Sequence, residues 1–229
     1  MRVIVTGSTG YIGGEVLRQC LANPAITSVV ALARRAPEIA TDPKLQVILH
    51  DDFTSFPSEL VAQLADADAC IYCLGSNVPV RPPELNRKIN LEYAISTARM
   101  FADLHGARPA AQAQTHFRFV YLSGALPEKD PERRLLFLAE NRRMRGELEN
   151  KLLELGKAKA GSGFEVFVTR PGFVQPAGAV VRAWLVGVVA NAILLPDLAA
   201  SLVHVALQGY DEMLVENDAL NGLAKKTTS

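Results

Sequence analysis

Three glycines near the start of the chain have the spacing of a phosphate-binding turn. Gly7, Gly10 and Gly13 lie within TGSTGYIGG, residues 6–14. In such a turn the first glycine permits a tight bend, the second lets the backbone approach a pyrophosphate, and the third lets a helix pack closely on a strand. The free N–H groups and positive dipole at the start of that helix attract the anion. We therefore expect a dinucleotide to bind here, held by Gly7, Ser8, Thr9, Gly10, Tyr11, Ile12 and Gly13.

The residues on either side of this turn predict a strand before it and a helix after it. Arg2–Val5 is a short β-branched run, which is typical of a buried strand. Apolar residues then recur at helical spacing, at Ile12, Val16, Leu17, Cys20 and Leu21. This order of strand, turn and helix favours a dinucleotide site over a glycine-rich turn without a ligand.

Further strands and helices alternate along the rest of the chain. Apolar runs predict strands at residues 28–33, 45–49, 69–74, 117–122 and 164–169. Helical patterns cover residues 58–64, 84–105 and 131–155, and a short helix begins at Asp197. Strands that are apolar on both faces predict an α/β fold, a Rossmann-like doubly wound parallel sheet of about six strands with helices on both faces and a small C-terminal helical lobe.

Two arginines follow one of these strands at the place where a doubly wound sheet binds its ligand. Arg34 and Arg35 come directly after residues 28–33. A binder of NAD usually has an acidic residue there for the ribose 2′-hydroxyl, whereas guanidinium groups suit a 2′-phosphate. We therefore expect NADP(H) as the cofactor, with NAD(H) less favoured. Two solvated arginines in a loop are the alternative.

Two other strand ends supply candidates for cofactor binding. Asp52, with Asp51 as its substitute, follows residues 45–49 and could accept a hydrogen bond from the adenine amino group. An acidic loop or a helix N-cap explains these residues equally well. Gly75 follows residues 69–74 and would let the backbone approach the cofactor, unless it is only a turn glycine.

Composition limits the class of partner. The 229 residues suffice for one domain with a sizeable core. The 24 basic and 24 acidic residues cancel, so nothing favours nucleic acid or an acidic membrane surface. Cys70 and Cys73 form a C-x-x-C pair within an apolar run, which we interpret as core packing with no metal site. Because the first strand begins at Arg2, we expect no signal peptide and a cytoplasmic protein.

One apolar segment, residues 179–195, raises the alternative of a membrane span. It is shorter than the roughly 20 residues that a span prefers, and Arg182 and Asn191 interrupt it. We therefore expect no membrane contact and a helix that packs Trp184 and Leu185 in the fold or in a homodimer. Residues 1–175 would form the NADP-binding Rossmann domain, and residues 176–229 a small C-terminal helical part of the same domain, for substrate binding or dimerisation.

These residues resemble the short-chain dehydrogenase/reductase superfamily, and most closely its atypical and extended branches, the NmrA-like and epimerase-like NADP-binding proteins of fungal type. TGSTGYIGG is very similar to that branch's T-G-x-x-G-x-x-G. The segment YLSG resembles the one that carries the family's catalytic serine, which implies a catalytic role for Ser123. RPGF resembles the segment that borders the nicotinamide, which implies roles for Pro171, Gly172 and Phe173. Asn90 lies where the family often has a polar residue.

The resemblance fails at the catalytic pair. The family usually carries Tyr-x-x-x-Lys on the helix after the fifth strand, where the tyrosine transfers a proton and the lysine holds the ribose. No tyrosine of this chain has a lysine four residues later. NRRMRGE resembles the family's Tyr-x-x-x-Lys-Gly-Glu, so Asn141 and Arg145 take the two positions. Asparagine cannot release a proton, but Arg145 can still hold a ribose or phosphate; a solvated charged helix is the alternative.

Two functions remain open. The first is an NADP(H)-dependent oxidoreductase or isomerase/epimerase acting on a small carbonyl-containing metabolite, with Ser123 and Asn141 orienting the substrate. The second is a non-catalytic NADP(H)-binding redox sensor or regulatory protein, which the missing Tyr and Lys favour. The complete set of strand-end residues keeps the enzyme slightly ahead, and a non-redox enzyme that uses the cofactor as a scaffold is a third reading. Tyr121 shares the strand face of Ser123, and we interpret it as a core residue.

Overall fold

A parallel sheet of seven strands forms the centre of the computed structural model, which describes residues 1–39, 41–106, 116–124, 127, 139–176 and 191–227. The strand order is β3-β2-β1-β4-β5-β6-β9, and each neighbouring pair is parallel. The bounds are β1 Arg2–Thr6, β2 Ser28–Ala33, β3 Leu45–Leu49, β4 Ala69–Tyr72, β5 Phe117–Leu122, β6 Phe164–Arg170 and β9 Leu214–Glu216. A second, two-stranded sheet pairs β7 (Phe173–Gln175) with β8 (Ala192–Leu194).

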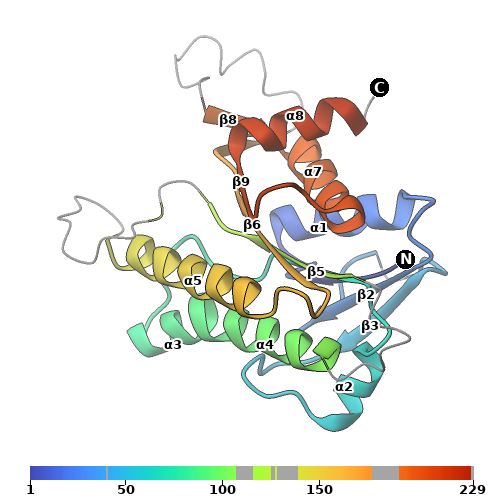
Figure 1. Ribbon diagram of the computed structural model, residues 1–229, viewed down its shortest axis with the longest axis horizontal. Coiled ribbons are helices and arrows are strands. Elements are labelled where there is room, and N and C mark those ends of the chain that lie inside the picture. Colours follow the sequence, from blue (N-terminus) through green and yellow to red (C-terminus); the bar gives the residue numbers. More distant parts are fainter. Residues whose placement is uncertain (40, 107–115, 125–126, 128–138, 177–190, 228–229) are drawn as a thin grey trace.

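Helices cover both faces of the main sheet (Figure 1). One face carries α1 (Tyr11–Ala22), α7 (Leu195–Gln208) and α8 (Asn217–Thr227). The other carries α2 (Ser58–Leu64), α4 (Tyr93–Gly106) and α5 (Ala139–Ala158). α3 (Pro83–Arg87) and a π-helical turn, Lys88–Glu92, lead into α4.

Two apolar cores result from this layering. Alternate residues of β1 point to opposite faces, so Ile4 belongs to the core beneath α4 and α5, while Val3 and Val5 belong to the core beneath α1 and α7. All three side chains are fully buried. This burial on both faces explains why the strand is an unbroken β-branched run and not an alternation of apolar and polar residues.

The strand order reverses between β1 and β4, which opens a crevice at their carboxyl ends. β2 and β3 continue on one side of β1, and β4, β5 and β6 on the other. The register pairs Thr6 of β1 with Tyr72 of β4. Gly7 and Cys73 therefore leave the sheet next to each other at this crevice.

The predicted fold class is confirmed, with one strand more than expected in the main sheet and with the β7–β8 pair, which was not predicted. β9 is the extra strand, and its three residues are too few for a periodic pattern to reveal. The strand predicted at 69–74 ends at Tyr72, and the single helix predicted at 84–105 is divided into α3, the π-helical turn and α4. The predicted helix at 131–155 is α5 from Ala139 onward, and its first eight residues lie outside the described part of the chain.

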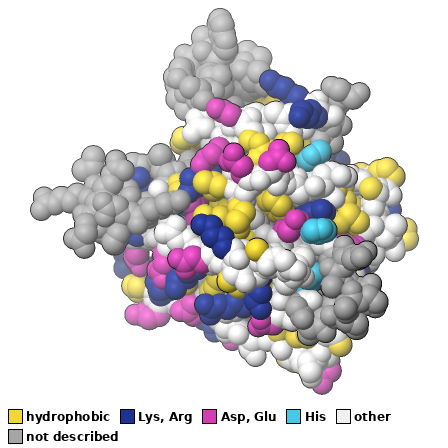
Figure 2. All heavy atoms as spheres, in the orientation of Figure 1, with side chains coloured by type: hydrophobic (Ala, Val, Ile, Leu, Met, Phe, Trp, Pro, Cys, Tyr) yellow, Lys and Arg dark blue, Asp and Glu magenta, His cyan; other side chains and the backbone are white. Residues whose placement is uncertain are grey.

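The C-terminal residues complete the core on the α1 side. α7 packs along α1, and its Leu198, Leu202 and Val205 are fully buried. The helix expected over residues 179–195 is wrong at its end, because Ala192–Leu194 form strand β8, which pairs with β7, and a new helix, α7, begins at Leu195. Residues 177–190, which include Trp184 and Leu185, lie outside the described residues, so the packing expected for them stays a prediction. Among the helices that the structure describes, none is long and apolar enough to cross a membrane. Acidic and basic side chains are interspersed over the face shown in Figure 2, as the net charge of zero suggests.

Candidate functional site

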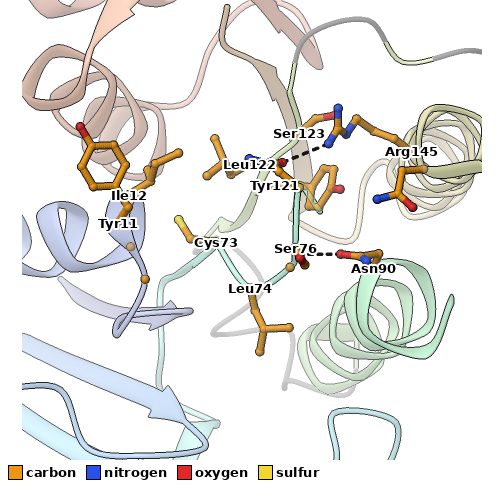
Figure 3. Close-up of a pocket in the computed structure, with 15 residues that line it drawn as sticks. Tyr11, Ile12, Cys73, Leu74, Ser76, Asn90, Tyr121, Leu122, Ser123 and Arg145 are labelled. Carbon is orange, nitrogen blue, oxygen red and sulfur yellow. Dashed lines mark hydrogen bonds between the residues drawn. The ribbon is translucent and has the colours of Figure 1, made fainter. Parts of the chain in front are cut away.

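A cavity of about 220 Å³ lies at the crevice, where β1, β4 and β5 end (Figure 3). The N-terminus of α1 lines one side and α5 the other. Its described lining comprises Gly10, Tyr11, Ile12, Gly13, Cys73, Leu74, Gly75, Ser76, Asn77, Asn90, Tyr121, Leu122, Ser123, Asn141 and Arg145. The structure therefore brings Ser123, Asn141 and Arg145 together with the glycine-rich turn.

A second cavity, of about 560 Å³, adjoins the first on the side of β2 and β3. The two share the lining residues Gly10, Cys73, Leu74 and Gly75. The remaining described lining of the second cavity is Gly7, Thr9, Ala33, Arg34, Arg35, Asp51 and Ile89. Candidates from separate strand ends thus lie along one connected space, with the arginines at one end and Ser123 at the other.

The three glycines of the turn are present for different physical reasons. Gly7 has a φ of +68°, and a Cβ there would lie 2.5 Å from the carbonyl oxygen of Cys73. A Cβ at Gly13 would lie 2.2 Å from the carbonyl oxygen of Gly7. A Cβ at Gly10 would meet only that same oxygen, at 3.2 Å. The chain's own packing therefore requires Gly7 and Gly13, whereas Gly10 mainly leaves room in front of α1.

The start of α1 has the features of an anion site. Gly10 is the N-cap, so no side chain caps the helix, and its first turn has no acidic residue. Ser8 is 2% exposed, and its Oγ has no hydrogen-bond partner among the described residues. A buried polar group left unpaired costs about 1–3 kcal/mol. A phosphate oxygen at this turn would offset that cost, so the residues present fit a dinucleotide.

The two aspartates after β3 have different surroundings. Asp52 accepts hydrogen bonds from the Thr54 hydroxyl at 2.6 Å and from Lys88 Nζ at 3.1 Å. Its pKa is lowered to about 2, first by the Thr54 hydroxyl and then by the Thr54 backbone N–H and Lys88. Asp51 is the one that lines the second cavity with Arg34 and Arg35. Asp52 is absent from the described lining of both cavities, and contact of either aspartate with a cofactor stays a prediction.

Ser123 is bonded to a buried carboxylate that the sequence analysis did not identify. Its hydroxyl donates to Oε1 of Glu149 at 2.6 Å, and Glu149 is 0% exposed. Arg170 Nε donates to both oxygens of Glu149, at 3.1 and 3.0 Å, and Arg170 Nη1 donates to Glu216 at 2.8 Å. With its proton directed at Glu149, the Ser123 hydroxyl can offer the cavity only its lone pairs.

A chain of three asparagine amides orients Asn141. The backbone N–H of Ser76 donates to Oδ1 of Asn90 at 2.7 Å, which leaves the Asn90 amide NH2 group to donate to Oδ1 of Asn86 at 2.8 Å. The Asn86 NH2 group in turn donates to Oδ1 of Asn141 at 2.8 Å. Because a backbone N–H can only donate, it determines the direction of the whole chain. Asn141 therefore presents an NH2 donor to the cavity.

Arg145 and Tyr121 lie on neighbouring walls of the first cavity (Figure 3). Arg145 Nη2 donates to Oδ1 of Asn77 at 3.2 Å, and its guanidinium faces Gly124. Burial raises the pKa of the Tyr121 hydroxyl well above its usual range, although the Arg145 charge and a hydrogen bond with Ser123 act in the opposite direction. Tyr121 is thus a neutral hydroxyl at the cavity wall as well as a core residue.

The residues after β6 lie outside the described lining of both cavities. Pro171 is buried and Phe173 is 67% exposed. The Gly172 N–H donates to Oδ1 of Asn217 at 2.7 Å, and a Cβ there would lie 1.8 Å from the carbonyl oxygen of Asn191. The glycine is therefore required for packing against the C-terminal segment. Contact of these residues with a nicotinamide stays a prediction.

Of the cysteine pair, Cys70 is buried among apolar residues and Cys73 is partly buried. Cys70 is 0% exposed and Cys73 borders the cavities. Burial raises the pKa of both thiols well above their usual range, so neither is a reactive thiolate near neutral pH. No cluster of potential metal ligands occurs among the residues that the structure describes.

Two residues of the site, Glu149 and Asn86, escaped sequence reasoning. Glu149 follows Arg145 by four residues on α5, a spacing that places both on one helix face. Asn86 precedes Asn90 by the same interval. The spacing alone could have suggested that Glu149 lies beside Arg145 and Asn86 beside Asn90. Only the packing of α5 on the sheet shows that these residues contact the lining of the first cavity.

Comparison with solved structures identifies the class of fold. The chain superposes on a short-chain dehydrogenase from Burkholderia cenocepacia J2315 in complex with NADP, with a TM-score of 0.70 and 16% identity over 100% of this chain and 92% of that one. The structure called ElxO with NADP bound gives a TM-score of 0.69 at 11% identity, over 96% and 98% of the two chains. The protein therefore has the fold of the short-chain dehydrogenases/reductases.

The curated relatives align with only part of this chain. Protein fmp52, mitochondrial, of Emericella nidulans is 25% identical over 195 residues, 79% of this chain and 72% of that protein. Leucinostatins biosynthesis cluster protein T of Purpureocillium lilacinum is 26% identical over 124 residues, 54% of this chain and only 42% of its own length. No family model matches the chain.

These relatives correct the expected localisation. We expected a cytoplasmic protein from the position of the first strand, and this expectation is contradicted, because the fmp52 relatives are named mitochondrial. The physical reason for the error is that a buried strand near the start of the sequence reports on folding and not on targeting.

Proposed function

We propose that this protein binds NADP(H) and acts as an oxidoreductase, or as an isomerase/epimerase, on a small carbonyl-containing metabolite. Its place would be in the NmrA-like or epimerase-like branch of the short-chain dehydrogenases/reductases. The observation that carries the proposal is the connected space from Arg34 and Arg35, past the glycine-rich turn, to Ser123. Two structural neighbours were solved with NADP bound, which supports the choice of cofactor.

The proposal gives each group along this space a role. The backbone at the start of α1 and the Ser8 hydroxyl would hold the pyrophosphate. Arg34 and Arg35 would bind the 2′-phosphate and Asp51 the adenine, while Arg145 would hold the nicotinamide ribose. When bound, the cofactor supplies or accepts a hydride. Asn141, through its NH2 group, would orient an oxygen acceptor of the substrate.

The test of the cofactor choice is a calorimetric titration with NADPH and NADH. NADPH should bind at least tenfold more tightly, because each charge-assisted contact to the 2′-phosphate contributes roughly 1.5–3 kcal/mol. The double variant Arg34→Ala with Arg35→Ala should lose this preference. Glu38→Gln is a matched control, because Glu38 borders Arg35 in an adjoining cavity and repels a phosphate, so its removal should keep or increase the preference. Equal affinities in the unmutated protein would contradict the assignment.

The second candidate function is a non-catalytic NADP(H) sensor. Its support is that neither Asn141 nor Arg145 can transfer a proton near neutral pH. NADPH oxidation against a panel of small aldehydes and ketones separates the two candidates. Tight NADPH binding without turnover of any compound in the panel would favour the sensor.

A further inference from the structure

The Ser123 hydroxyl joins the cavity to a carboxylate that solvent does not reach. Ser123 lines the cavity, and its Oγ lies 2.6 Å from Oε1 of Glu149. A carboxylate accepts hydrogen bonds and an ionised one has none to give, so the hydroxyl proton points at Glu149. The oxygen has two lone pairs, so beside the hydrogen bond with Tyr121 one lone pair of Oγ is available to a hydroxyl group in the cavity.

The charged groups around Glu149 do not balance one another. Arg170 faces Glu149 through Nε and Nη2 and faces Glu216 through Nη1, so one guanidinium is shared by two carboxylates. These three groups together carry one more negative than positive charge. Side-chain exposure is 0% for Glu149, 14% for Arg170 and 58% for Glu216, so the extra charge is partly held in a region of weak solvent screening. Protonation of Glu149 would make the group neutral.

We propose that Ser123 and Glu149 form a proton relay that replaces the missing tyrosine and lysine; this rests on the proposed oxidoreductase function. In alcohol oxidation, the substrate hydroxyl gives its proton to Ser123 Oγ as the Ser123 proton passes to Glu149 Oε1. The carbinol carbon gives its hydride to the oxidised nicotinamide, and the carbonyl forms. In reduction, the same proton returns from Glu149 through Ser123 to the oxygen that gains it.

The other cavity groups are less suited to this role. Asn141 and Arg145 do not exchange protons near neutral pH. Burial keeps the Tyr121 hydroxyl neutral, because it raises the pKa well above the usual range. A group that stays neutral can donate a hydrogen bond but is a poor acceptor of a substrate proton. The relay through Ser123 ends at the buried carboxylate of Glu149.

The experiment compares Ser123→Ala, Ser123→Thr, Glu149→Gln and Glu147→Gln. Ser123→Ala should lower kcat by roughly 10²–10⁴-fold, the usual contribution of proton transfer, with NADPH affinity within a factor of about two. Ser123→Thr keeps the hydroxyl and should recover most of the rate. Glu149→Gln should lower kcat as much as Ser123→Ala does. The double variant Ser123→Ala with Glu149→Gln should lower kcat no further than either single variant, because the two residues act as a unit. Glu147 lies on the same helix, 37% exposed and paired with Arg87, so Glu147→Gln should leave kcat unchanged.

Two further readouts separate proton transfer from a structural role. The pH profile of kcat in the unmutated protein should show the effect of one ionisable group. This effect should be absent in Glu149→Gln, and also in Ser123→Ala, where Glu149 no longer has a path to the substrate. The charged and titratable groups facing Glu149 are Arg170 from β6, with Glu216 of β9 behind it, and Tyr121 from β5. Proton NMR of the protein without substrate should show a slowly exchanging downfield hydroxyl resonance. It should be lost in Ser123→Ala and in Glu149→Gln and kept in Glu147→Gln.

The outcomes distinguish failure of the relay from failure of the proposed function. Full turnover in folded Ser123→Ala overturns the relay and leaves the oxidoreductase function intact. The same conclusion follows if Tyr121→Phe loses turnover while Ser123→Ala and Glu149→Gln keep it. NADPH binding without turnover in the unmutated protein overturns the relay together with the enzyme function. If the unmutated protein does not bind NADPH, both the relay and the oxidoreductase function are overturned, because each needs the cofactor. Because Ser123→Ala retains the ion pair between Glu149 and Arg170, it decides the matter even if Glu149→Gln does not fold.

Discussion

At the scale of single residues, the turn at the start of α1 separates glycines needed by the chain from the one left for a ligand. Gly7 and Gly13 are each opposed by backbone atoms closer than a Cβ can approach. Gly10 has ordinary extended φ and ψ angles of −90° and 170° and one moderately close neighbour. The same residue type therefore has a folding role at two positions, and at the third it leaves space in front of the helix N-terminus.

This difference predicts different outcomes for two valine substitutions. Gly10→Val should leave thermal stability nearly unchanged and reduce NADPH affinity by at least tenfold, because the side chain occupies the space in front of the helix N-terminus. Gly13→Val should lower the free energy of unfolding by more than about 2 kcal/mol, because it forces α1 away from β1. Denaturant unfolding and calorimetric titration of both variants check this. A folded Gly13→Val protein with normal NADPH affinity would contradict the geometry.

At the scale of elements, the π-helical turn and α5 together build the polar wall of the first cavity. The π-helical turn Lys88–Glu92 carries Asn90, and α5 carries Asn141, Arg145 and Glu149. π-helical turns within helices are frequent at functional sites, because the extra residue re-aims the side chains on one face. The asparagine chain joins these two elements through Asn86 of α3.

Asn86 is therefore expected to support both stability and the orientation of Asn141. Asn86→Leu keeps the volume but leaves the N–H of Val80 and the NH2 group of Asn90 without their acceptor. Both groups are only partly buried, so the free energy of unfolding should fall by about 1 kcal/mol for each group left unpaired, the lower end of the cost of an unsatisfied polar group. KM for a carbonyl substrate should rise, because Asn141 loses the bond that directs its NH2 group. Denaturant unfolding and the KM of Asn86→Leu check the two expectations, and an unchanged KM would contradict the role of Asn86 in orienting Asn141.

At the scale of the whole molecule, the predicted ligand connects both halves of the sheet. The two cavities are lined by residues of β2, β5, α1 and α5 and by the segments that directly follow β1 and β4, so a bound dinucleotide would hold elements from both sides of the strand reversal. A ligand that binds only the folded state stabilises it in proportion to the logarithm of its concentration. The effect on global unfolding therefore measures the affinity directly.

NADPH at 100 times its dissociation constant should stabilise the folded protein by about 2.7 kcal/mol. For a chain of this size that corresponds to a rise in Tm of about 5–10 °C. NADH at the same concentration should give at most about half of this rise, if its affinity is tenfold lower. Thermal unfolding with each nucleotide checks the prediction, and equal shifts would contradict the preference for NADP(H).

The sequence alone determined the fold class, the strand–turn–helix start and the strand ends at which polar residues gather. These features depend on local spacing, such as Gly7 to Gly13 or the apolar run before Arg34, and local spacing is visible without a structure. The resemblance of residues 141–147 to a family motif, with Asn141 and Arg145 in place of Tyr and Lys, was likewise visible in the sequence.

Only the tertiary structure decided which of these residues work together. Asp51 and Asp52 are neighbours in sequence, yet Lys88 and Thr54 engage Asp52 and leave Asp51 at the cavity. Ser123 and Glu149 are 26 residues apart, and they meet because α5 packs across the ends of β5 and β6. β9 joins the sheet because β6 offers it an unpaired edge. Such contacts depend on how whole elements pack and on side-chain direction, which no local pattern of residue types contains.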